Sequence, residues 1–281
     1  MSDVTEGLSL RPFETIEEYR ACVALQEETW GRGFSERVPP AILKVSRLVG
    51  GVASGAWDER GRLAGFVFGM TGPRGGEVVH WSDMLAVRAD LRDSGLGTRL
   101  KVHQRELVAA IGVKKMLWTF DPLRARNAYL NFNKLGIVVR EYAQDMYGQT
   151  DSPLHRGIGT DRFVALWLLS SERVCARVQG LERGPGAEGR TDGELALGAV
   201  FEESRRRPRP GEPALGLDGQ KLLVAIPSDI GAVMDRDMEL ALEWRHATRA
   251  VLTHYLARGY EVRELVRGEA TSDYLLAPIT S

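Results

Sequence analysis

Residues 85–98, with the sequence LAVRADLRDSGLGT, contain the motif that decides the fold. An apolar, strand-like stretch ends at Val87, and Gly95 and Gly97 precede an amphipathic stretch that predicts a long helix ending at Gly112. The first turn of a helix has backbone N–H groups without intrahelical partners, at the positive end of the helix dipole. Glycines let an anion approach this backbone closely because they have no side chain. The stretch therefore predicts a loop that binds a phosphate or pyrophosphate group.

The residues of this loop exclude two common phosphate-binding motifs. A Walker A loop requires Gly-Lys-Ser/Thr, which does not follow Gly97. A dinucleotide-binding fingerprint requires a third glycine where this chain has Leu100. The alternative interpretation is an ordinary strand-to-helix turn, in which the glycines serve backbone geometry alone.

The elements around the loop predict an α/β (α+β) fold with a mixed, mostly antiparallel sheet flanked by helices. Hydrophobic periodicity and turn residues predict strands over residues 8–13, 51–58, 62–70, 77–87, 114–121, 137–148 and 162–170. Helices are predicted over residues 14–30, 40–48 and 124–136, besides the helix that ends at Gly112. Three consecutive strands precede the loop, which argues against a repeating βα doubly wound sheet.

The composition changes after this first set of elements, and the change predicts three regions. Residues 1–172 form the first domain, and residues 173–219 read as an irregular linker rich in glycine and proline. Residues 220–281 predict a β-α-β-β extension, with a strand at 221–227 and a long helix at 235–258. Such a small unit buries little core alone, so we expect it to dock on the first domain or on a partner chain.

Composition also excludes several functional classes. The 281 residues include 37 Lys+Arg and 38 Asp+Glu, and this balance gives no electrostatic reason to expect nucleic acid or a membrane as partner. The two cysteines and the spacing of the five histidines predict no metal site. No apolar run approaches the roughly 18 residues of a membrane span. The acidic, polar N-terminal stretch is not a signal peptide, so we expect a cytoplasmic protein.

The order of elements and the loop together resemble the GNAT superfamily of acetyltransferases. The chain has Arg-x-x-Gly-x-Gly at residues 92–97 after a strand that ends at Leu85–Val87, and a later helix that ends in Lys134-Leu135-Gly136. The resemblance covers residues 8–170. The run TFDPLRARNAYLNFNKLG (119–136) is similar to a poorly characterised subgroup with a C-terminal extension.

The resemblance implies an N-acetyltransferase that uses acetyl-CoA as cosubstrate and needs no metal. An amine acceptor, either a small metabolite or a protein amine, would attack the thioester directly, and a homodimer is possible. Backbone groups of Leu85, Ala86 and Val87 would bind the pantetheine arm, and Asn127 would lie near this arm or the acetyl group. The resemblance assigns the pyrophosphate to a run of seven residues: Arg92, Asp93, Ser94, Gly95, Leu96, Gly97 and Thr98.

Acetyl transfer to an amine needs a group that removes a proton from the amine. Strand alternation places Asp83 on one face with Val79, Trp81 and Leu85, while His80, Ser82 and Met84 lie on the other. Apolar neighbours would raise the pKa of a carboxyl group, which suits a base. The alternative is a structural aspartate, and His80 is a second candidate base.

The proton donor for the leaving thiolate departs from the family pattern. Phe132 stands where these enzymes often have a tyrosine, and Phe132 cannot donate a proton. Tyr142 and Tyr147 on the following strand, or Tyr129, could replace it. The alternative function is therefore a catalytically impaired CoA-binding module that acts as a sensor or assembly partner.

Two charged residues, Asp161 and Arg162, precede the last strand of the first domain. An arginine binds carboxylates through two parallel hydrogen bonds, so this pair could orient a substrate carboxylate. The alternative is an ion pair that holds the loop.

Overall fold

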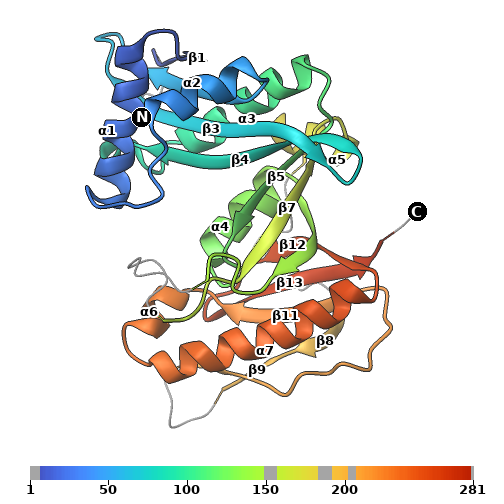
Figure 1. Cartoon of the computed structure of the whole chain (residues 1–281). Coiled ribbons are helices and arrows are strands. Elements are labelled where there is room, and N and C mark those ends of the chain that lie inside the picture. Colours follow the sequence, from blue (N-terminus) through green and yellow to red (C-terminus); the bar gives the residue numbers. More distant parts are fainter. Residues whose placement is uncertain (1–6, 149–156, 183–191, 202–206, 280–281) are drawn as a thin grey trace. The chain divides into compact units, whose positions relative to one another are not determined.

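The computed structural model describes residues 7–148, 157–182, 192–201 and 207–279. The chain divides into two compact units between Trp118 and Thr119, within β5 (Lys115–Phe120) (Figure 1). We refer to them as the N-terminal and the C-terminal unit.

The N-terminal unit contains a sheet with the strand order β1-β2-β3-β4-β5. Its other strands and its helices are β1 (Ser9–Pro12), α1 (Ile16–Trp30), α2 (Pro40–Leu48), β2 (Val52–Trp57), β3 (Leu63–Arg74), β4 (Glu77–Val87), the 3-10 helix η1 (Ala89–Leu91) and α3 (Leu96–Ala110). The pairs β1–β2, β2–β3 and β3–β4 are antiparallel, and β5 runs parallel to β4.

Local sequence signals define the beginnings of two helices in this unit. At the start of α1, Thr15 Oγ1 accepts a hydrogen bond from the Glu18 N–H at 3.3 Å, and the Glu18 carboxylate accepts one from the Thr15 N–H. Helix α2 begins at Pro40, a residue that suits the first turn because its missing N–H is not needed there. Helix α1 then buries Tyr19 against Phe13, with the ring centroids 5.6 Å apart.

A β-bulge interrupts β4 at Asp83. Across the β3–β4 ladder, Phe68 lies opposite Met84 and Gly69 lies opposite Ser82, so Asp83 is an extra residue without a partner on β3. A bulge bends the strand and changes which side chains share a face.

The bulge overturns the uninterrupted alternation that the sequence predicts for β4. That alternation would place Leu85 opposite to His80 and Ser82. In the structure Ser82 donates a hydrogen bond to Gln104 of α3, and a Cβ on Gly97 of the same helix would lie 3.6 Å from Leu85 Cδ2. Ser82 and Leu85 therefore both face α3.

The C-terminal unit contains a sheet with the order β7-β6-β12-β13-β11-β8 and a small pair, β10-β9. Its strands are β6 (Val138–Ala143), β7 (Arg162–Leu168), β8 (Glu194–Leu197), β9 (Ala199–Val200), β10 (Arg209–Pro210), β11 (Leu222–Pro227), β12 (Tyr260–Val266) and β13 (Thr271–Pro278). Its helices are α4 (Ala125–Tyr129), the π-helix η2 (Leu130–Lys134), α5 (Glu172–Val178), α6 (Ile230–Met234) and α7 (Met238–Ala257). The predicted fold class, a mixed and mostly antiparallel sheet flanked by helices, is confirmed.

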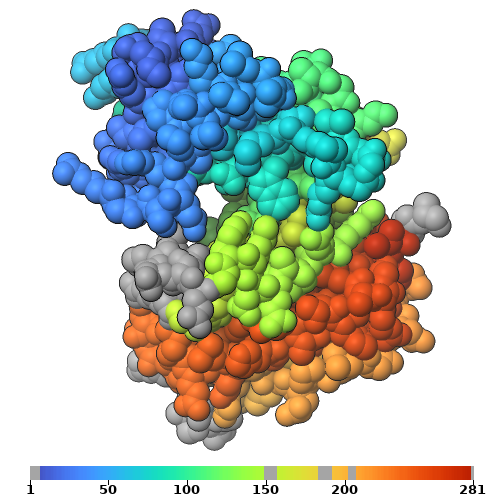
Figure 2. All heavy atoms as spheres, in the orientation of Figure 1, coloured from blue at the N-terminus to red at the C-terminus, as the bar shows by residue number. Residues whose placement is uncertain are grey.

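The last strands of the chain join the sheet that contains β6 and β7. β12 pairs antiparallel with β6 at Val262 and Val139, and β13 pairs with β12. Figure 2 shows the yellow-green surface of β6 beside the red surface of the β12–β13 region. The three-region division with boundaries at 172 and 219 stays a prediction, whereas the two compact units divide at residue 118.

The segment 173–219, expected to be irregular, contains regular elements where the structure describes it. α5 occupies its beginning, and β8 pairs in parallel with β11. Ser171 caps α5 by accepting a hydrogen bond from the Val174 N–H at 3.3 Å, so a serine N-cap starts a helix in a stretch whose glycines and prolines indicated a linker. The helix predicted over 124–136 is also different, because a π-helix replaces its second half.

Candidate functional site

The loop between β4 and α3 has the backbone shape that its glycines predict. Asp93 has a φ of 66° and Gly95, the residue before α3, has a φ of 86°. A left-handed conformation is favourable for glycine and costly for residues with a side chain. A Cβ on Gly95 would meet no atom within 4 Å, so the space in front of this residue is open.

The first turn of α3 keeps donors that the described part of the chain does not use. Ser94 Oγ donates to the Leu91 carbonyl at 2.6 Å and accepts from the Leu96 N–H at 3.4 Å. The N–H groups of Gly97 and Thr98 have no acceptor among the described residues. The first turn contains no acidic side chain that would repel an anion. These donors can bind phosphate oxygens.

Arg92 stands beside this helix end. Its side chain is exposed, and no ion pair joins it to another described residue. A guanidinium in this position can bind a phosphate through two parallel hydrogen bonds. The structure thus brings together, in one loop, the residues from Arg92 to Thr98 that the sequence assigned to the pyrophosphate.

The end of β4 offers backbone groups along one edge. Leu85, Ala86 and Val87 pair with β3 through Val67, Phe66 and Gly65. The described pairing of β4 with β5 consists of His80 with Met116 and Trp81 with Leu117, before the bulge. The backbone on the other edge of residues 85–87 therefore has no described strand partner and can accept or donate hydrogen bonds to a ligand.

Asp83 is accessible and also partly desolvated. Its side chain is exposed to solvent at the bulge. The surrounding protein raises the pKa of the carboxyl group by desolvation, and the negative charge of Glu36 raises it further. A carboxylate with a raised pKa is a better proton acceptor near neutral pH than an ordinary aspartate.

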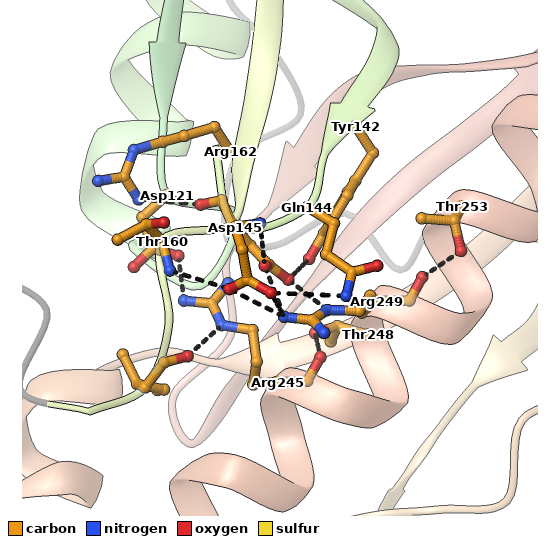
Figure 3. A network of polar contacts seen from close by, with 12 residues as sticks. Asp121, Tyr142, Gln144, Asp145, Thr160, Arg162, Arg245, Thr248, Arg249 and Thr253 are labelled. Atoms are coloured by element: carbon orange, nitrogen blue, oxygen red, sulfur yellow. Dashed lines mark hydrogen bonds and ion pairs between the residues drawn. The ribbon is translucent and has the colours of Figure 1, made fainter. Parts of the chain in front are cut away.

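Tyr142 lies in a polar network of the C-terminal unit (Figure 3). Its hydroxyl donates to the carboxylate of Asp161, which also accepts from Arg249 at 2.6 and 2.7 Å and from the Asp145 N–H at 3.0 Å. Burial and this hydrogen bond to Asp161 raise the pKa of Tyr142. The Tyr142 proton is therefore held inside the network.

Asp161 and Arg162 are ordered by the same network. Burial would raise the pKa of Asp161, but hydrogen bonds from Arg249, Tyr142 and the Asp145 backbone lower it below its usual value. Arg162 Nη1 donates to the Asp161 carbonyl at 2.9 Å, and burial lowers the pKa of this guanidinium. These contacts support the interpretation of Asp161 as a residue that holds the loop.

Two arginines of α7 complete this network, and their contacts with Asp121 and Asp161 were not predicted from the sequence. Arg245 Nη2 bonds to Asp121 at 2.8 Å and its Nε donates to the Ile158 carbonyl at 3.2 Å. Arg249 follows four residues later and therefore lies on the same face of the helix. The signal available in the sequence was two arginines four residues apart, next to Trp244, which is buried.

The other predicted residues of the C-terminal unit are outside this network or at its edge. Tyr147 is exposed, its hydroxyl lies 2.8 Å from Thr119 Oγ1, and the Arg162 guanidinium lies 5.3 Å from its ring centre. Asn127 is exposed on α4, where its Oδ1 accepts from Asn131 at 3.4 Å. Phe132 is fully buried in an aromatic cluster with Phe120, Phe163 and Tyr274.

The described residues contain no group of three or more His, Cys, Asp or Glu side chains placed to hold a metal ion. In the same residues, no helix has the length and apolar character needed to cross a membrane.

No protein-family model matches the sequence, and no curated protein matches it. The solved structures to which the chain is similar include acetyltransferases of the GNAT family. A GNAT acetyltransferase from Streptococcus pneumoniae has 18% identity and a TM-score of 0.45, with 57% of this chain and 98% of that chain covered. Aminoglycoside 6'-acetyltransferase type Ii has 17% identity and a TM-score of 0.46, with 58% and 99% covered.

A chain of the NatC complex, solved with a Gag peptide and CoA, is also similar. It has 13% identity and a TM-score of 0.47, and the match covers 58% of this chain and 99% of that chain.

Proposed function

We propose that this chain is an N-acetyltransferase of the GNAT type that binds acetyl-CoA at the β4–α3 loop. The observation that carries the proposal is the pair of unused N–H groups at Gly97 and Thr98, beside the exposed Arg92. An open approach over Gly95 lets a pyrophosphate reach these donors. The free backbone edge of residues 85–87 supports binding of the amide groups of pantetheine.

In the proposed reaction the nitrogen of a neutral amine attacks the carbonyl carbon of the thioester. The C–S bond breaks, the amide forms, and the proton of the amine passes to a base while the thiolate receives a proton. Asp83 is the proposed base because its carboxylate is accessible and its pKa is raised. Of the two tyrosines predicted as donors, Tyr142 is bonded to the Asp161 carboxylate, whereas Tyr147 has an exposed side chain whose hydroxyl shares a hydrogen bond with Thr119.

The test of this proposal compares two glycines at the two ends of α3. Gly95 and Gly112 both have a φ above 80°, and a Cβ on either would meet no atom within 4 Å. Gly95→Trp should lower the affinity for acetyl-CoA by more than about 100-fold, because the indole would occupy the open approach to the donors. Gly112→Trp carries a similar backbone strain and should leave the affinity unchanged.

Calorimetric titration with acetyl-CoA measures both variants, and thermal unfolding verifies that each is folded. Equal affinities in the two variants would refute the loop as the binding site. Absence of binding in the wild-type protein would refute the proposed function itself.

A second candidate function is a CoA-binding module without turnover. The observation that favours it is Phe132, which lies fully buried where the family pattern has a proton-donating tyrosine. CoA binding without thioester cleavage, measured as free thiol release with a panel of mixed amines, would favour this module over the enzyme.

A further inference from the structure

A chain of buried polar side chains crosses the N-terminal unit beneath α3. It begins at Lys101, whose Nζ lies 2.6 Å from Ser82 Oγ and 3.9 Å from the centre of the Trp118 ring. Ser82 Oγ lies 2.8 Å from Gln104 Oε1. Lys101, Ser82 and Gln104 are all buried, so no bulk water competes for these contacts.

The chain continues through a buried histidine to the protein surface. Gln104 Nε2 lies 3.0 Å from His80 Nε2, and His80 Nδ1 lies 2.8 Å from Thr71 Oγ1. Thr71 Oγ1 lies 2.6 Å from the carbonyl oxygen of Gly50, a half-buried residue.

Each link of this chain has a defined direction because the last acceptor is a carbonyl. Thr71 must donate its hydroxyl proton to Gly50, so Thr71 accepts from His80 Nδ1–H. His80 Nε2 is then the acceptor for the Gln104 amide N–H, and Gln104 Oε1 accepts from the Ser82 hydroxyl. Ser82 Oγ in turn accepts from Lys101. All donors therefore point from Lys101 toward Gly50.

Lys101 has no carboxylate partner among the described residues. The groups that contact its Nζ are Ser82 on β4 and the Trp118 ring on β5, and its positive charge is felt by the titratable group His80. Further along α3, His103 turns to Ser54 of β2 at 2.8 Å, and Glu106 is the acidic group beside it. Burial without a counter-ion lowers the pKa of Lys101 to about 7.

We propose that this series of hydrogen bonds is a two-state relay. In the relay, protonation of Lys101 determines the direction of every hydrogen bond as far as His80 and Thr71. A protonated Lys101 can only donate, which gives the direction described above. A neutral Lys101 has a lone pair, and among the described residues the Ser82 hydroxyl is the hydrogen-bonding group at Nζ that can turn and donate to it.

The second state has the same number of protons on every group except Lys101. Once Ser82 donates to Lys101, the Gln104 amide turns over, donates to Ser82 and accepts from His80 Nε2–H. His80 moves its single proton from Nδ1 to Nε2, and its Nδ1 accepts from Thr71. The carbonyl of Gly50 loses its donor, which costs little because this half-buried group can bond to water.

The relay couples CoA binding at the proposed site to protonation of Lys101, and this consequence rests on the proposed function. Lys101 follows Thr98 by three residues, so its backbone is about 4.5 Å further along α3 from the proposed pyrophosphate. An anion bound at the first turn of the same helix favours the protonated lysine and would raise its pKa by roughly one unit. Binding of CoA should therefore be accompanied by uptake of a proton by Lys101.

The first experiment determines the tautomer of His80 as a function of pH. Two-bond 1H–15N spectra of protein labelled with 15N-histidine should show Nδ1–H below about pH 6 and Nε2–H above about pH 8, with a midpoint near the Lys101 pKa of about 7. Ser82→Ala interrupts the chain and should leave His80 in one tautomer at all pH values. The matched control, Ser54→Ala, removes the hydroxyl bonded to His103 and should not change the His80 midpoint.

Two results would overturn the relay. One is a wild-type His80 that keeps the same tautomer while the Lys101 side-chain resonances titrate. The other is a Ser82→Ala protein in which the tautomer of His80 still changes at the wild-type midpoint. Both results can be read in protein that binds no CoA.

The second experiment measures proton uptake when CoA binds at pH 8, by calorimetry in two buffers that differ in ionisation enthalpy. A shift of one unit from a pKa of about 7 corresponds to roughly 0.4 proton per site. Lys101→Met should reduce the uptake to zero. Binding of CoA to the wild type without uptake would overturn the coupling, whereas absence of binding would overturn the proposed function and leave the tautomer result intact.

Discussion

The β4–α3 loop and the polar network of the C-terminal unit contain similar groups but differ in how many already have partners. In the loop, the N–H groups of Gly97 and Thr98 and the exposed guanidinium of Arg92 have none among the described residues. In the network, the Asp161 carboxylate accepts four hydrogen bonds, from Tyr142, the Asp145 N–H and two nitrogens of Arg249. Groups without partners can bind a ligand, whereas groups with a full set of partners stabilise the fold.

The strongest test of this difference is the substitution Asp161→Asn, which should destabilise the C-terminal unit. Asp161 is fully buried, and its removal as an anion leaves Arg249 and the nearby Arg245 with less negative charge around them. We expect a loss of about 3 kcal/mol in the free energy of unfolding. Chemical denaturation monitored by tryptophan fluorescence measures it.

A matched control comes from the same network. Asp145 contacts Arg249 at 3.4 Å but its side chain is about half exposed, so Asp145→Asn should cost at most about 1 kcal/mol. Equal losses for the two substitutions would contradict the structural role of Asp161.

The same network makes acid stability depend on Asp161. Its folded-state pKa is lowered, so the stability that it contributes is present above its unfolded pKa of about 4 and is lost as the pH falls through the folded value. The wild type should therefore lose stability more steeply than Asp161→Asn below about pH 4. Parallel acid-denaturation curves would show that Asp161 has the same pKa in both states.

The next effect concerns Asp83. Like the loop residues it is exposed, and like the residues of the network it is partly desolvated. Asp83→Asn should lower kcat by about 100-fold with little change in acetyl-CoA affinity, because the substitution removes the proposed base and keeps the shape. Since the pKa of Asp83 is raised, the wild-type rate should fall as the pH drops through a value above the usual range of an aspartate. Glu36→Gln should move this midpoint downward. Unchanged kcat in Asp83→Asn would remove it as the base.

The sequence alone predicts the elements around the loop well, because each depends on local signals. The strand of residues 77–87, the glycines at 95 and 112 and the proline at 40 define ends that the structure reproduces. The bulge at Asp83 could not be predicted, since it depends on how β3 pairs with β4 across a turn.

Residues that meet only through the fold were also missed. Arg245 and Asp121 are 124 residues apart in the chain, and no local pattern connects them. The hydrogen bonds from Lys101 to Thr71 likewise join side chains of β3, β4 and α3 that are far apart in the sequence. A lysine on the buried face of a helix is unusual and could have indicated such a network.

The smallest expected effect returns to the loop, where it tests whether Arg92 is a ligand for phosphate. Arg92→Gln should weaken acetyl-CoA binding by about tenfold, and the loss should shrink at high salt because the lost term is an exposed charge interaction. Arg20→Gln removes another exposed arginine of the N-terminal unit, in α1, and should leave the affinity unchanged. An Arg92→Gln protein with wild-type affinity at low salt would mean that the backbone N–H groups bind the pyrophosphate without this side chain. A loss that is equal at all salt concentrations would instead indicate that Arg92 shapes the loop, because a structural role does not depend on screening.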